Sequence, residues 1–254
     1  MKILIGLAGD GTRFKKAGYK NIKPLVRTGN MTMIQKVVDS LVWPNAEYYF
    51  VTRQDHLQQF PYLKTLLESM GHVTVIDELT RGAAESLVSC KPVMESNDPF
   101  ISVNCDQVFD WDTNELQELV KQYPATSWLT VYKNLDEARH SFAIPPEDYV
   151  EQDFWDTNPC PVNHVAEKTR LGTMSPTATT GFYHFFSGKE FYNAVQEALR
   201  EPPEYGGEYY VGPIYNKLIR KNFPVSMYKV HTKTFWPTGT IPDYINYNHK
   251  YFAS

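Results

Sequence analysis

Short apolar runs alternate with segments of helical periodicity over the first 104 residues of the chain. A β-branched and aliphatic run at 2–7 ends in a glycine-rich turn, and the apolar residues of 33–41 then lie three and four positions apart. The same alternation predicts strands at 48–52, 72–76 and 99–104 and helices at 58–70 and 83–93. Strands that alternate with helices at this spacing indicate βαβ units and a mainly parallel sheet.

After about residue 113 the pattern is less regular. It predicts strands at 127–132, 163–167 and 180–186, helices at 188–200 and 211–220, and a polar, proline-bearing loop at 145–161. Because the later elements extend the same sheet, we expect the 254 residues to form one α/β domain, although this length also allows two small ones. The expected fold is a three-layer sandwich with helices on both faces of a mixed, mainly parallel sheet.

Composition excludes several classes of partner. The net charge of −4 and the pI of about 6.0 argue against nucleic acid, so an anionic ligand would need a local cluster of positive groups. No apolar run approaches the roughly 20 residues that span a membrane. Cys90, Cys105 and Cys160 are odd in number and form no CxxC pair, which favours a reducing cytoplasm over a disulfide framework or a zinc site.

The first predicted strand runs directly into a glycine-rich segment, Leu7-Ala8-Gly9-Asp10-Gly11-Thr12-Arg13-Phe14. Glycines let backbone N–H groups approach an anion closely, and Arg13 and Lys23 supply two nearby cations. The segment is not a Walker A motif, because no Gly-Lys-Ser/Thr follows, and Phe14 breaks the dinucleotide fingerprint. On these residues alone, a phosphate-binding loop and a tight turn with surface charges fit equally well.

Leu-Ala-Gly-x-Gly-Thr-Arg-Phe, followed by Lys23-Pro24-Leu25, resembles the signature of the sugar-phosphate nucleotidyltransferases, which make nucleotide sugars on a Rossmann-like, GT-A-type fold. The resemblance implies that a nucleoside monophosphate moves from a nucleoside triphosphate to a phosphorylated acceptor and that pyrophosphate is released. It assigns phosphate contacts and a catalytic role to Arg13 and Lys23, and nucleotide binding to the loop residues Leu7, Ala8, Gly9, Asp10, Gly11 and Thr12. Asp10 stands where the family more often has alanine or another small residue.

Two further motifs follow in the family's order. Residues 80–86 resemble the segment that packs against the nucleotide base, with Gly82 and Ala83 in contact with it; the other interpretation is a helix start capped by Thr80. Asp106, which ends a predicted strand, resembles the aspartate that binds Mg²⁺, a cation that prefers carboxylate and phosphate oxygens. The nearby Asp110 and Asp112 could cap a helix or form a reserve metal site, and we prefer capping.

The acceptor side is predicted from three more segments. Glu167 and Lys168 resemble the family's Glu-Lys pair, in which the glutamate binds acceptor hydroxyls and the catalytic lysine binds the acceptor phosphate. An exposed ion pair at a strand end is the alternative. Gly181 and Glu208 resemble acceptor-binding positions of the family, although Glu208 could instead compensate the charge of a helix N-terminus.

The last motif departs from the family. Residues 236–243 resemble its Trp-x-Asp-x-Gly-Thr-Pro-Glu-Asp motif, but Pro237 stands where many relatives carry the second metal carboxylate. Asp243 matches the later aspartate, which caps a helix. The resemblance further implies a nucleotide-binding half at 1–112, an acceptor-binding half at 113–254, a cytoplasmic location and, in many members, a homo-oligomer. A GT-A-type glycosyltransferase using Asp106 and Asp110, and a non-catalytic nucleotide or sugar-phosphate binding protein, are the alternatives.

Overall fold

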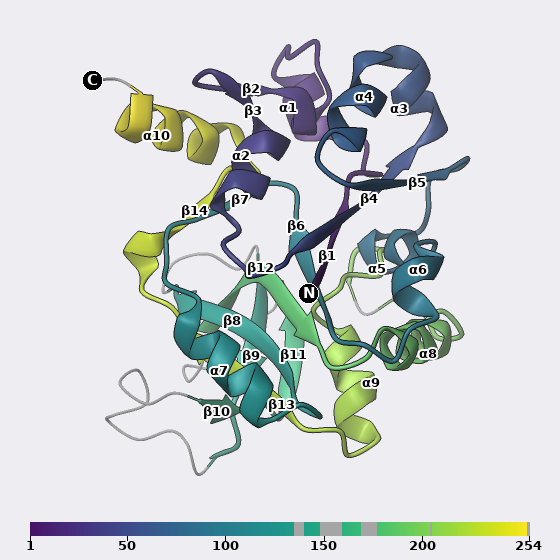
Figure 1. Ribbon diagram of the computed structural model, residues 1–254, viewed down its shortest axis with the longest axis vertical. Helices are drawn as coiled ribbons and strands as arrows, with labels where there is room; N and C mark the ends of the chain where they lie inside the picture. The colour runs from purple at the N-terminus through teal and green to yellow at the C-terminus, as the bar shows by residue number, and fades with distance from the viewer. Residues whose placement is uncertain (135–139, 148–158, 169–176, 204, 253–254) are drawn as a thin grey trace.

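A ten-stranded sheet runs through the middle of the molecule in this computed structural model, which describes residues 1–134, 140–147, 159–168, 177–203 and 205–252 (Figure 1). The strands of this sheet are β1 (Lys2–Gly6), β4 (Glu47–Arg53), β5 (His72–Ile76), β6 (Phe100–Asn104), β8 (Ser127–Lys133), β9 (Ser141–Ile144), β10 (Cys160–Pro161), β11 (His164–Glu167), β12 (Thr177–Phe185) and β13 (Val225–Lys229). Their spatial order is β10-β13-β8-β12-β6-β1-β4-β5, and β9 pairs with β11 and β12 beside this path.

The sheet is mixed, as expected. Strands β6, β1, β4 and β5 are mutually parallel, and β13 is parallel to β8. Strand β12 runs antiparallel to both of its main neighbours, β6 and β8. Two short ribbons stand apart from the sheet: β2 (Arg27–Thr28) with β3 (Met31–Thr32), and β7 (Gln107–Phe109) with β14 (Phe235–Pro237).

Helices cover both faces of the sheet and make it the middle layer of three. On one face, α2 (Met33–Ser40), α4 (Tyr62–Glu68) and α7 (Asn114–Gln122) share a core with the strands. The other face is covered by α5 (Ala83–Leu87), α6 (Lys91–Met94), α8 (Gly188–Ala198) and α9 (Ile214–Arg220). The remaining helical segments are α1 (Thr12–Lys16), η1 (Lys23–Leu25), α3 (Gln54–Gln59), η3 (Thr232–Thr234) and α10 (Ile241–Phe252).

The alternation of side chains along β1 separates the two cores. Ile3 and Ile5 are fully buried on the face of α2, whereas Leu4 is fully buried on the face of α5. A strand that is buried on both faces reads as a continuous apolar run, which is why residues 2–7 gave a clear prediction. Among the described residues, no helix is both long and apolar enough to cross a membrane.

Two predicted helices are interrupted, the first of them at a proline. The helix expected at 58–70 begins only at Tyr62, because the residue before Pro61 disfavours the helical region, and α3 ends before it. The helix expected at 83–93 is two short helices, α5 and α6. The break falls at residues 88–90, and Pro92 lies in the first turn of α6, where its missing N–H costs no helical hydrogen bond.

Most later predictions are confirmed, with shifts of a few residues. The strands at 127–132, 163–167 and 180–186 correspond to β8, β11 and β12, and the helices at 188–200 and 211–220 to α8 and α9. Of the loop expected at 145–161, residues 148–158 lie outside the described residues, and its last two residues form strand β10 instead. Helices α7 and α10 and strands β7, β9, β13 and β14 were not predicted.

The position of β1 relative to β6 determines where a ligand can bind. The chain leaves β1 and builds β4 and β5 on one side, and then returns to place β6 on the other side of β1. Gly6 and Asn104 are paired at the carboxyl ends of the two strands. In open α/β sheets, ligands bind outside the carboxyl ends at such a reversal of strand order.

Candidate functional site

The glycine loop leaves the carboxyl end of β1 at this reversal. Leu7 and Ala8 are buried, and the Leu7 N–H donates to Val51 O at 2.7 Å, which fixes the start of the loop to β4. Gly11 then adopts a left-handed conformation, φ 59°, and begins α1. Gly9 has open space where a side chain would be, and Thr12 is exposed. The loop therefore presents small residues and backbone to solvent above the sheet.

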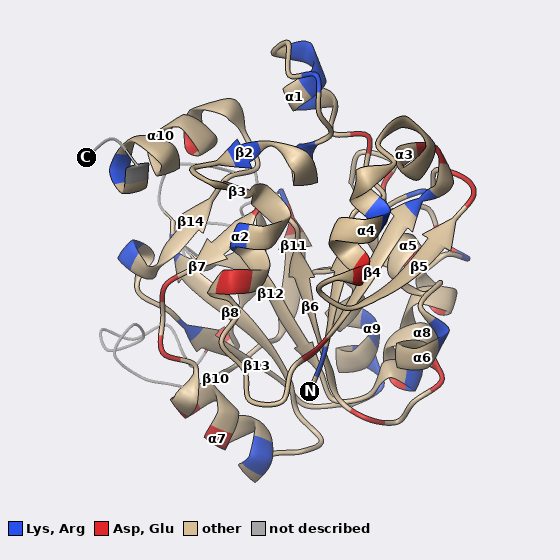
Figure 2. Cartoon of the chain, turned by 45° about the horizontal axis from the view of Figure 1, so that its top comes forward, with Lys and Arg blue, Asp and Glu red and all other residues tan. Residues whose placement is uncertain are grey.

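Arg13 lies in α1, whose Lys and Arg residues mark the end of the molecule nearest the loop in Figure 2. Its side chain is exposed and makes no hydrogen bond or ion pair with the described residues. Its charge is close enough to Lys23 to act on that residue's pKa. Arg13 is thus a cation beside the loop with its donors available to a ligand.

Asp10 is tied to an arginine to which the sequence interpretation gave no role. Arg53, the last residue of β4, is buried, and its Nη1 donates to Asp10 Oδ1 at 2.6 Å. The Arg53 guanidinium also binds Asp55 through two hydrogen bonds. These hydrogen bonds lower the pKa of Asp55 to about 2 and raise that of Arg53 above its ordinary value. The three charged groups therefore form one ionised network beneath the loop.

Lys23 and Asp106 come together although 83 residues separate them. Lys23 Nζ lies 2.5 Å from Asp106 Oδ2, and both side chains are largely buried. Burial lowers the pKa of Lys23, but the Asp106 carboxylate and its hydrogen bond outweigh this, and the pKa is raised above its ordinary value. The structure thus holds a cation against the carboxylate to which the resemblance assigned a metal.

The segment with Pro237 folds directly against this carboxylate. Pro237 pairs with Gln107 in the β14–β7 ribbon, and the Thr238 N–H and hydroxyl both donate to the Asp106 carbonyl, at 2.8 and 2.9 Å. A Cβ at Gly239 would lie 2.5 Å from Asp106 Oδ2, so a larger residue there would displace the Asp106 carboxylate. The backbone therefore holds Asp106 in place, while Pro237 contributes no side-chain oxygen.

The residues around Asp106 supply only part of the coordination shell that a metal ion would need. Asp106 offers carboxylate oxygens, but the described residues contain no group of three or more His, Cys, Asp or Glu side chains that could hold an ion. Asp110 is separated from Asp106 by the whole of β7, roughly 13 Å along an extended chain. It is therefore too far to replace the missing carboxylate, and most ligands of an ion at Asp106 would have to come from a bound substrate.

The other aspartates in these motifs act at helix ends. Asp112 Oδ1 accepts the Asn114 N–H at 2.9 Å at the start of α7, which agrees with the preference for capping. At the start of α10, Thr240 and Asp243 exchange two hydrogen bonds, in which the Asp243 N–H donates to Thr240 Oγ1 and the Thr240 hydroxyl donates to Asp243 Oδ2. Thr240 therefore accepts a backbone N–H of α10, and the Asp243 carboxylate binds the Thr240 hydroxyl; capping by Asp243 itself stays a prediction.

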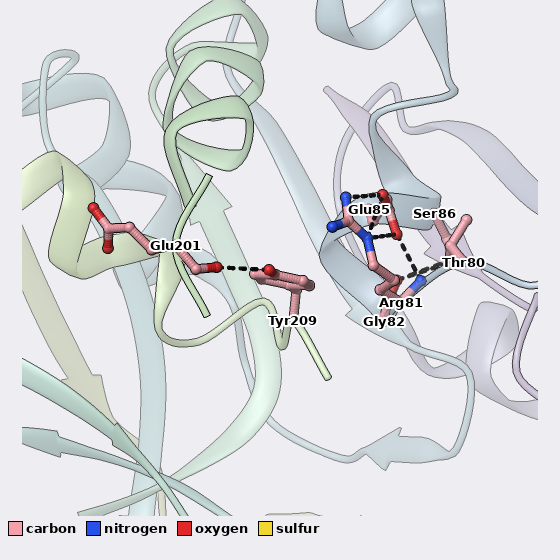
Figure 3. A network of polar contacts seen from close by, with 7 residues as sticks. All are labelled: Thr80, Arg81, Gly82, Glu85, Ser86, Glu201 and Tyr209. Carbon is pink, nitrogen blue, oxygen red and sulfur yellow. Dashed lines mark hydrogen bonds and ion pairs between the residues drawn. The ribbon is translucent and has the colours of Figure 1, made fainter. Parts of the chain in front are cut away.

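The segment 80–86 turns sharply against a later part of the chain (Figure 3). Gly82 has φ 152°, and a Cβ there would overlap the backbone N and O of Tyr209. Backbone hydrogen bonds join Tyr209 to Arg81 and Ala84, on either side of Gly82 and Ala83. The residue preceding α5 is Gly82, and Thr80 instead contacts Ser86 and the Gly82 carbonyl, so the expectation that Thr80 caps this helix was wrong.

Glu167 and Lys168 end β11 and face a ring of aromatic and polar groups. Glu167 is buried and accepts a hydrogen bond from the Ser141 hydroxyl. Lys168 Nζ lies 3.8 Å from Glu167 Oε1, 2.5 Å from the Tyr210 hydroxyl, and 4.0 Å from the centre of the Tyr210 ring. Only 4% and 18% of the two side chains are exposed, so the alternative of a solvated surface pair does not hold.

Lys168 also has an uncommon backbone conformation. Its φ of 49° is left-handed, a region that disfavours residues with a Cβ by roughly 1–2 kcal/mol. The Lys168 N–H donates to the His140 carbonyl at 2.9 Å, and this hydrogen bond helps to keep the Lys168 backbone in the left-handed conformation. Strained backbone of this kind is found at functional sites more often than elsewhere.

Gly181 and Glu208 occupy two different settings. Gly181 lies at a bulge in β12, with φ 82°, and a Cβ there would come within 2.6 Å of Asn104 Nδ2, so it lies beside the end of β6. Glu208 is exposed and follows two left-handed glycines in a tight turn that pairs it with Tyr205. It precedes α9 by six residues and is not part of its first turn, although it borders the same pocket as Ile214 at the start of that helix.

Tyr210 joins these groups, although it is one of 17 tyrosines and nothing in its sequence context distinguishes it. Burial and the neighbouring Glu208 carboxylate raise its pKa, so the hydroxyl keeps its proton. Beside it lies a small pocket that is partly open to solvent and is bordered by Glu167, Tyr205, Glu208, Tyr209, Tyr210 and Lys217. Two of the residues predicted for the acceptor, Glu167 and Glu208, therefore border one pocket.

A family model for nucleotidyl transferases matches residues 2–254. The chain belongs to the nucleotidyl transferase family. It is therefore an enzyme that transfers nucleotidyl groups, and the family generally uses a divalent metal.

Solved structures show the same fold. A nucleoside-diphosphate-sugar pyrophosphorylase from Vibrio cholerae RC9 superimposes with a TM-score of 0.79 at 20% identity, over 98% of this chain and 100% of that one. A UDP-glucose pyrophosphorylase complexed with UDP-glucose gives 0.74 at 16%, over 99% and 98%. A UTP-bound UGPase from Acinetobacter baumannii gives 0.70 at 17%, over 98% and 92%. These likenesses confirm the Rossmann-like α/β fold of this nucleotidyl transferase.

Proposed function

We propose that this nucleotidyl transferase moves a nucleoside monophosphate from a nucleoside triphosphate to a phosphorylated small molecule, a sugar phosphate by the resemblance, and releases pyrophosphate. The observation that carries the proposal is the meeting of the glycine loop, Lys23 and Asp106 at the carboxyl ends of β1 and β6. This is the place where the strand order reverses and where such sheets bind ligands. The pocket bordered by Glu167, Glu208 and Tyr210 is the place where we expect the second substrate to bind.

In this proposal the loop residues 7–12 cradle the triphosphate. The exposed Arg13 guanidinium binds phosphate oxygens without giving up any protein contact. Lys23 leaves Asp106 for a phosphate oxygen as the triphosphate arrives. Gly82 and Ala83, held by Tyr209, provide a flat backbone surface for the base.

On the acceptor side, Lys168 holds the phosphate and Glu167 accepts hydrogen bonds from acceptor hydroxyls. Glu208 borders the same pocket as Glu167, whereas Gly181 lies beside Asn104 at the end of β6. One acceptor phosphate oxygen attacks the α-phosphorus; the new P–O bond forms as the bond to the β-phosphate oxygen breaks, and pyrophosphate carries away the electron pair. No covalent protein intermediate is needed, so the enzyme contributes positioning and charge neutralisation.

Asp106 is the residue that would hold Mg²⁺ in this reaction. The protein offers the Asp106 carboxylate but no second carboxylate at position 237, which is proline. The remaining ligands of the ion would therefore be triphosphate oxygens. When bound, the ion supplies charge neutralisation on the phosphates.

The test is a pyrophosphate-release assay with Mg²⁺, each common nucleoside triphosphate, and a panel of phosphorylated sugars and alcohols. We expect one pair of substrates to release pyrophosphate, and omission of the acceptor to abolish the release. Pyrophosphate from no pair, together with turnover of a nucleotide sugar, would overturn the proposal in favour of a glycosyltransferase. Nucleotide binding without either reaction would indicate a binding protein.

A further inference from the structure

Arg53 is the most deeply buried guanidinium near the glycine loop, and the proposed reaction gives it no task. Only 9% of its side chain is exposed, although it stands at the end of β4 beside a solvent-facing loop. A buried charge is costly unless it is paired and hydrogen-bonded. Arg53 meets that requirement with carboxylates from two different segments, Asp10 in the loop and Asp55 in α3.

The contacts of Arg53 reach the loop at two points. Its Nη1 donates to Asp10 Oδ1 at 2.6 Å and lies 3.3 Å from the Ala8 carbonyl. The Nε and Nη2 groups bind Asp55 as a fork, so the guanidinium plane is fixed from the opposite side. Gly9 and Gly11, which flank Asp10, have no side chains with which to anchor the loop. The Asp10–Arg53 ion pair is therefore the loop's side-chain anchor to the sheet.

The Asp10 carboxylate is also a negative charge at a position where it would repel a triphosphate. Its side chain is 38% exposed, and it sits between the two glycines whose backbone the phosphates would approach. An unpaired carboxylate there would repel the ligand, because like charges at short range disfavour binding. The hydrogen bond from Arg53, a cation that Asp55 shares, compensates part of this charge and directs one Asp10 oxygen toward β4.

We propose that Arg53 is a positioning residue for the triphosphate, which holds and neutralises Asp10 so that the glycine loop accepts phosphate groups. The proposal rests on the proposed function of the loop. Arg53 touches no reacting atom in it and acts only through Asp10 and the Ala8 carbonyl.

The experiment compares Arg53→Met, Asp10→Asn and the double variant with the full-length wild type. Binding is measured by calorimetric titration with inorganic tripolyphosphate and with each common nucleoside triphosphate and its monophosphate. We expect Arg53→Met to weaken triphosphate affinity about tenfold or more, and monophosphate affinity less, because the repulsion from Asp10 grows with ligand charge. Adding Asp10→Asn should restore most of the lost affinity, because the carboxylate that needs neutralising is gone.

A merely structural Arg53 would behave differently. Loss of fold would weaken all ligands alike, and Asp10→Asn would restore nothing; either result overturns the proposal. Lys121→Met is the matched control, because Lys121 forms an exposed ion pair with Glu118 on α7, and its affinities should equal those of the wild type. Should Arg53→Met not fold, Arg53→Lys replaces it. The lysine keeps the positive charge but not the forked pair of N–H donors. We therefore expect faster amide hydrogen exchange at residues 7–12 than in the wild type, while triphosphate affinity is largely kept. Unchanged exchange overturns the proposal.

The two proposals fail in distinguishable ways. If the wild type binds no triphosphate, the proposed function falls and the inference falls with it. If the wild type binds triphosphate and Arg53→Met binds it equally well, only the inference falls.

Discussion

Two cations that we assign to the two sides of the proposed site, Arg13 and Lys168, are held in opposite ways. On the nucleotide side, Arg13 is exposed and has no ion-pair partner among the described residues, and Gly11 provides the left-handed backbone at no steric cost. On the acceptor side, Lys168 is mostly buried, rests on the Tyr210 ring, and adopts a left-handed backbone itself. An anion can be added at Arg13, but at Lys168 it must replace contacts that already exist. We therefore expect the nucleotide side to respond to loss of charge, and the acceptor side to respond to loss of position.

The largest effect is expected for Arg13→Ala. Removing a donor to the phosphates should lower kcat/KM of pyrophosphate release by roughly 10²–10³-fold. The melting temperature should not change, because the side chain is exposed and makes no contact that the fold needs. Full activity in this variant would remove Arg13 from the mechanism.

Gly82→Ala should disturb the nucleotide and acceptor sides together, because Gly82 packs against the backbone of Tyr209, the neighbour of Tyr210. The new Cβ would overlap Tyr209 backbone and require a φ of 152°, so we expect a loss of about 3 kcal/mol or more in the free energy of unfolding. Gly206→Ala is the control, with φ 60° and nothing within 4 Å, and should cost about 1–2 kcal/mol. Chemical denaturation measures both, and equal losses would show that backbone strain alone matters at Gly82.

Tyr210→Phe should affect the acceptor side alone. The ring stays under Lys168, but the hydroxyl that receives its hydrogen bond is lost, a change worth about 1 kcal/mol. We expect KM for the acceptor to rise about fivefold while KM for the triphosphate stays constant. Equal changes in the two KM values, from steady-state kinetics with each substrate varied, would contradict the division into two sides.

The smallest effect near neutral pH is expected from a core residue that belongs to neither side. Burial of His184 lowers its pKa from 6.5 to about 3. Below pH 6.5 the unfolded chain binds a proton that the folded one does not, so stability falls as pH decreases toward 3, by at most about 1.4 kcal/mol per pH unit. His184→Leu should flatten this part of the stability profile in urea denaturation, and an unchanged slope would contradict the assignment.

The first half of the fold was predictable because each local pattern there agrees with the tertiary structure. Residues 2–7 are apolar on both faces of a buried strand, and Thr32 and Gln35 form a capping box at the helix start, where periodicity also begins. One error comes from Pro61, whose effect on a helix is local and was outweighed by apolar periodicity. The other is the break at residues 88–90 between α5 and α6, which the same periodicity did not show. Strands such as β7 and β14 are three residues long, too short for any period to show.

The site was predictable only where a motif marks it. The order of motifs led to Lys23 and Asp106 before their contact was visible. Arg53 and Tyr210 were missed because their roles arise from contacts over 43 and 42 residues, with Asp10 and Lys168, and a lone arginine or tyrosine carries no such information. Pairings of this kind come from the topology of the sheet and not from local sequence.

Tyr209 and Tyr210 are adjacent, yet Tyr209 is bound to the nucleotide segment at Arg81 and Ala84, and Tyr210 to Lys168. Tyr209 is held through its backbone N–H and carbonyl, whereas Tyr210 is held through its hydroxyl, so this division depends on the count of residues and not only on their identity. A single insertion or deletion between Gly207 and Tyr209 would place a different residue beside Gly82 and move the Tyr210 hydroxyl away from Lys168. The turn before them therefore constrains chain length, and we expect variants of this enzyme to accept substitutions there far more readily than changes in length.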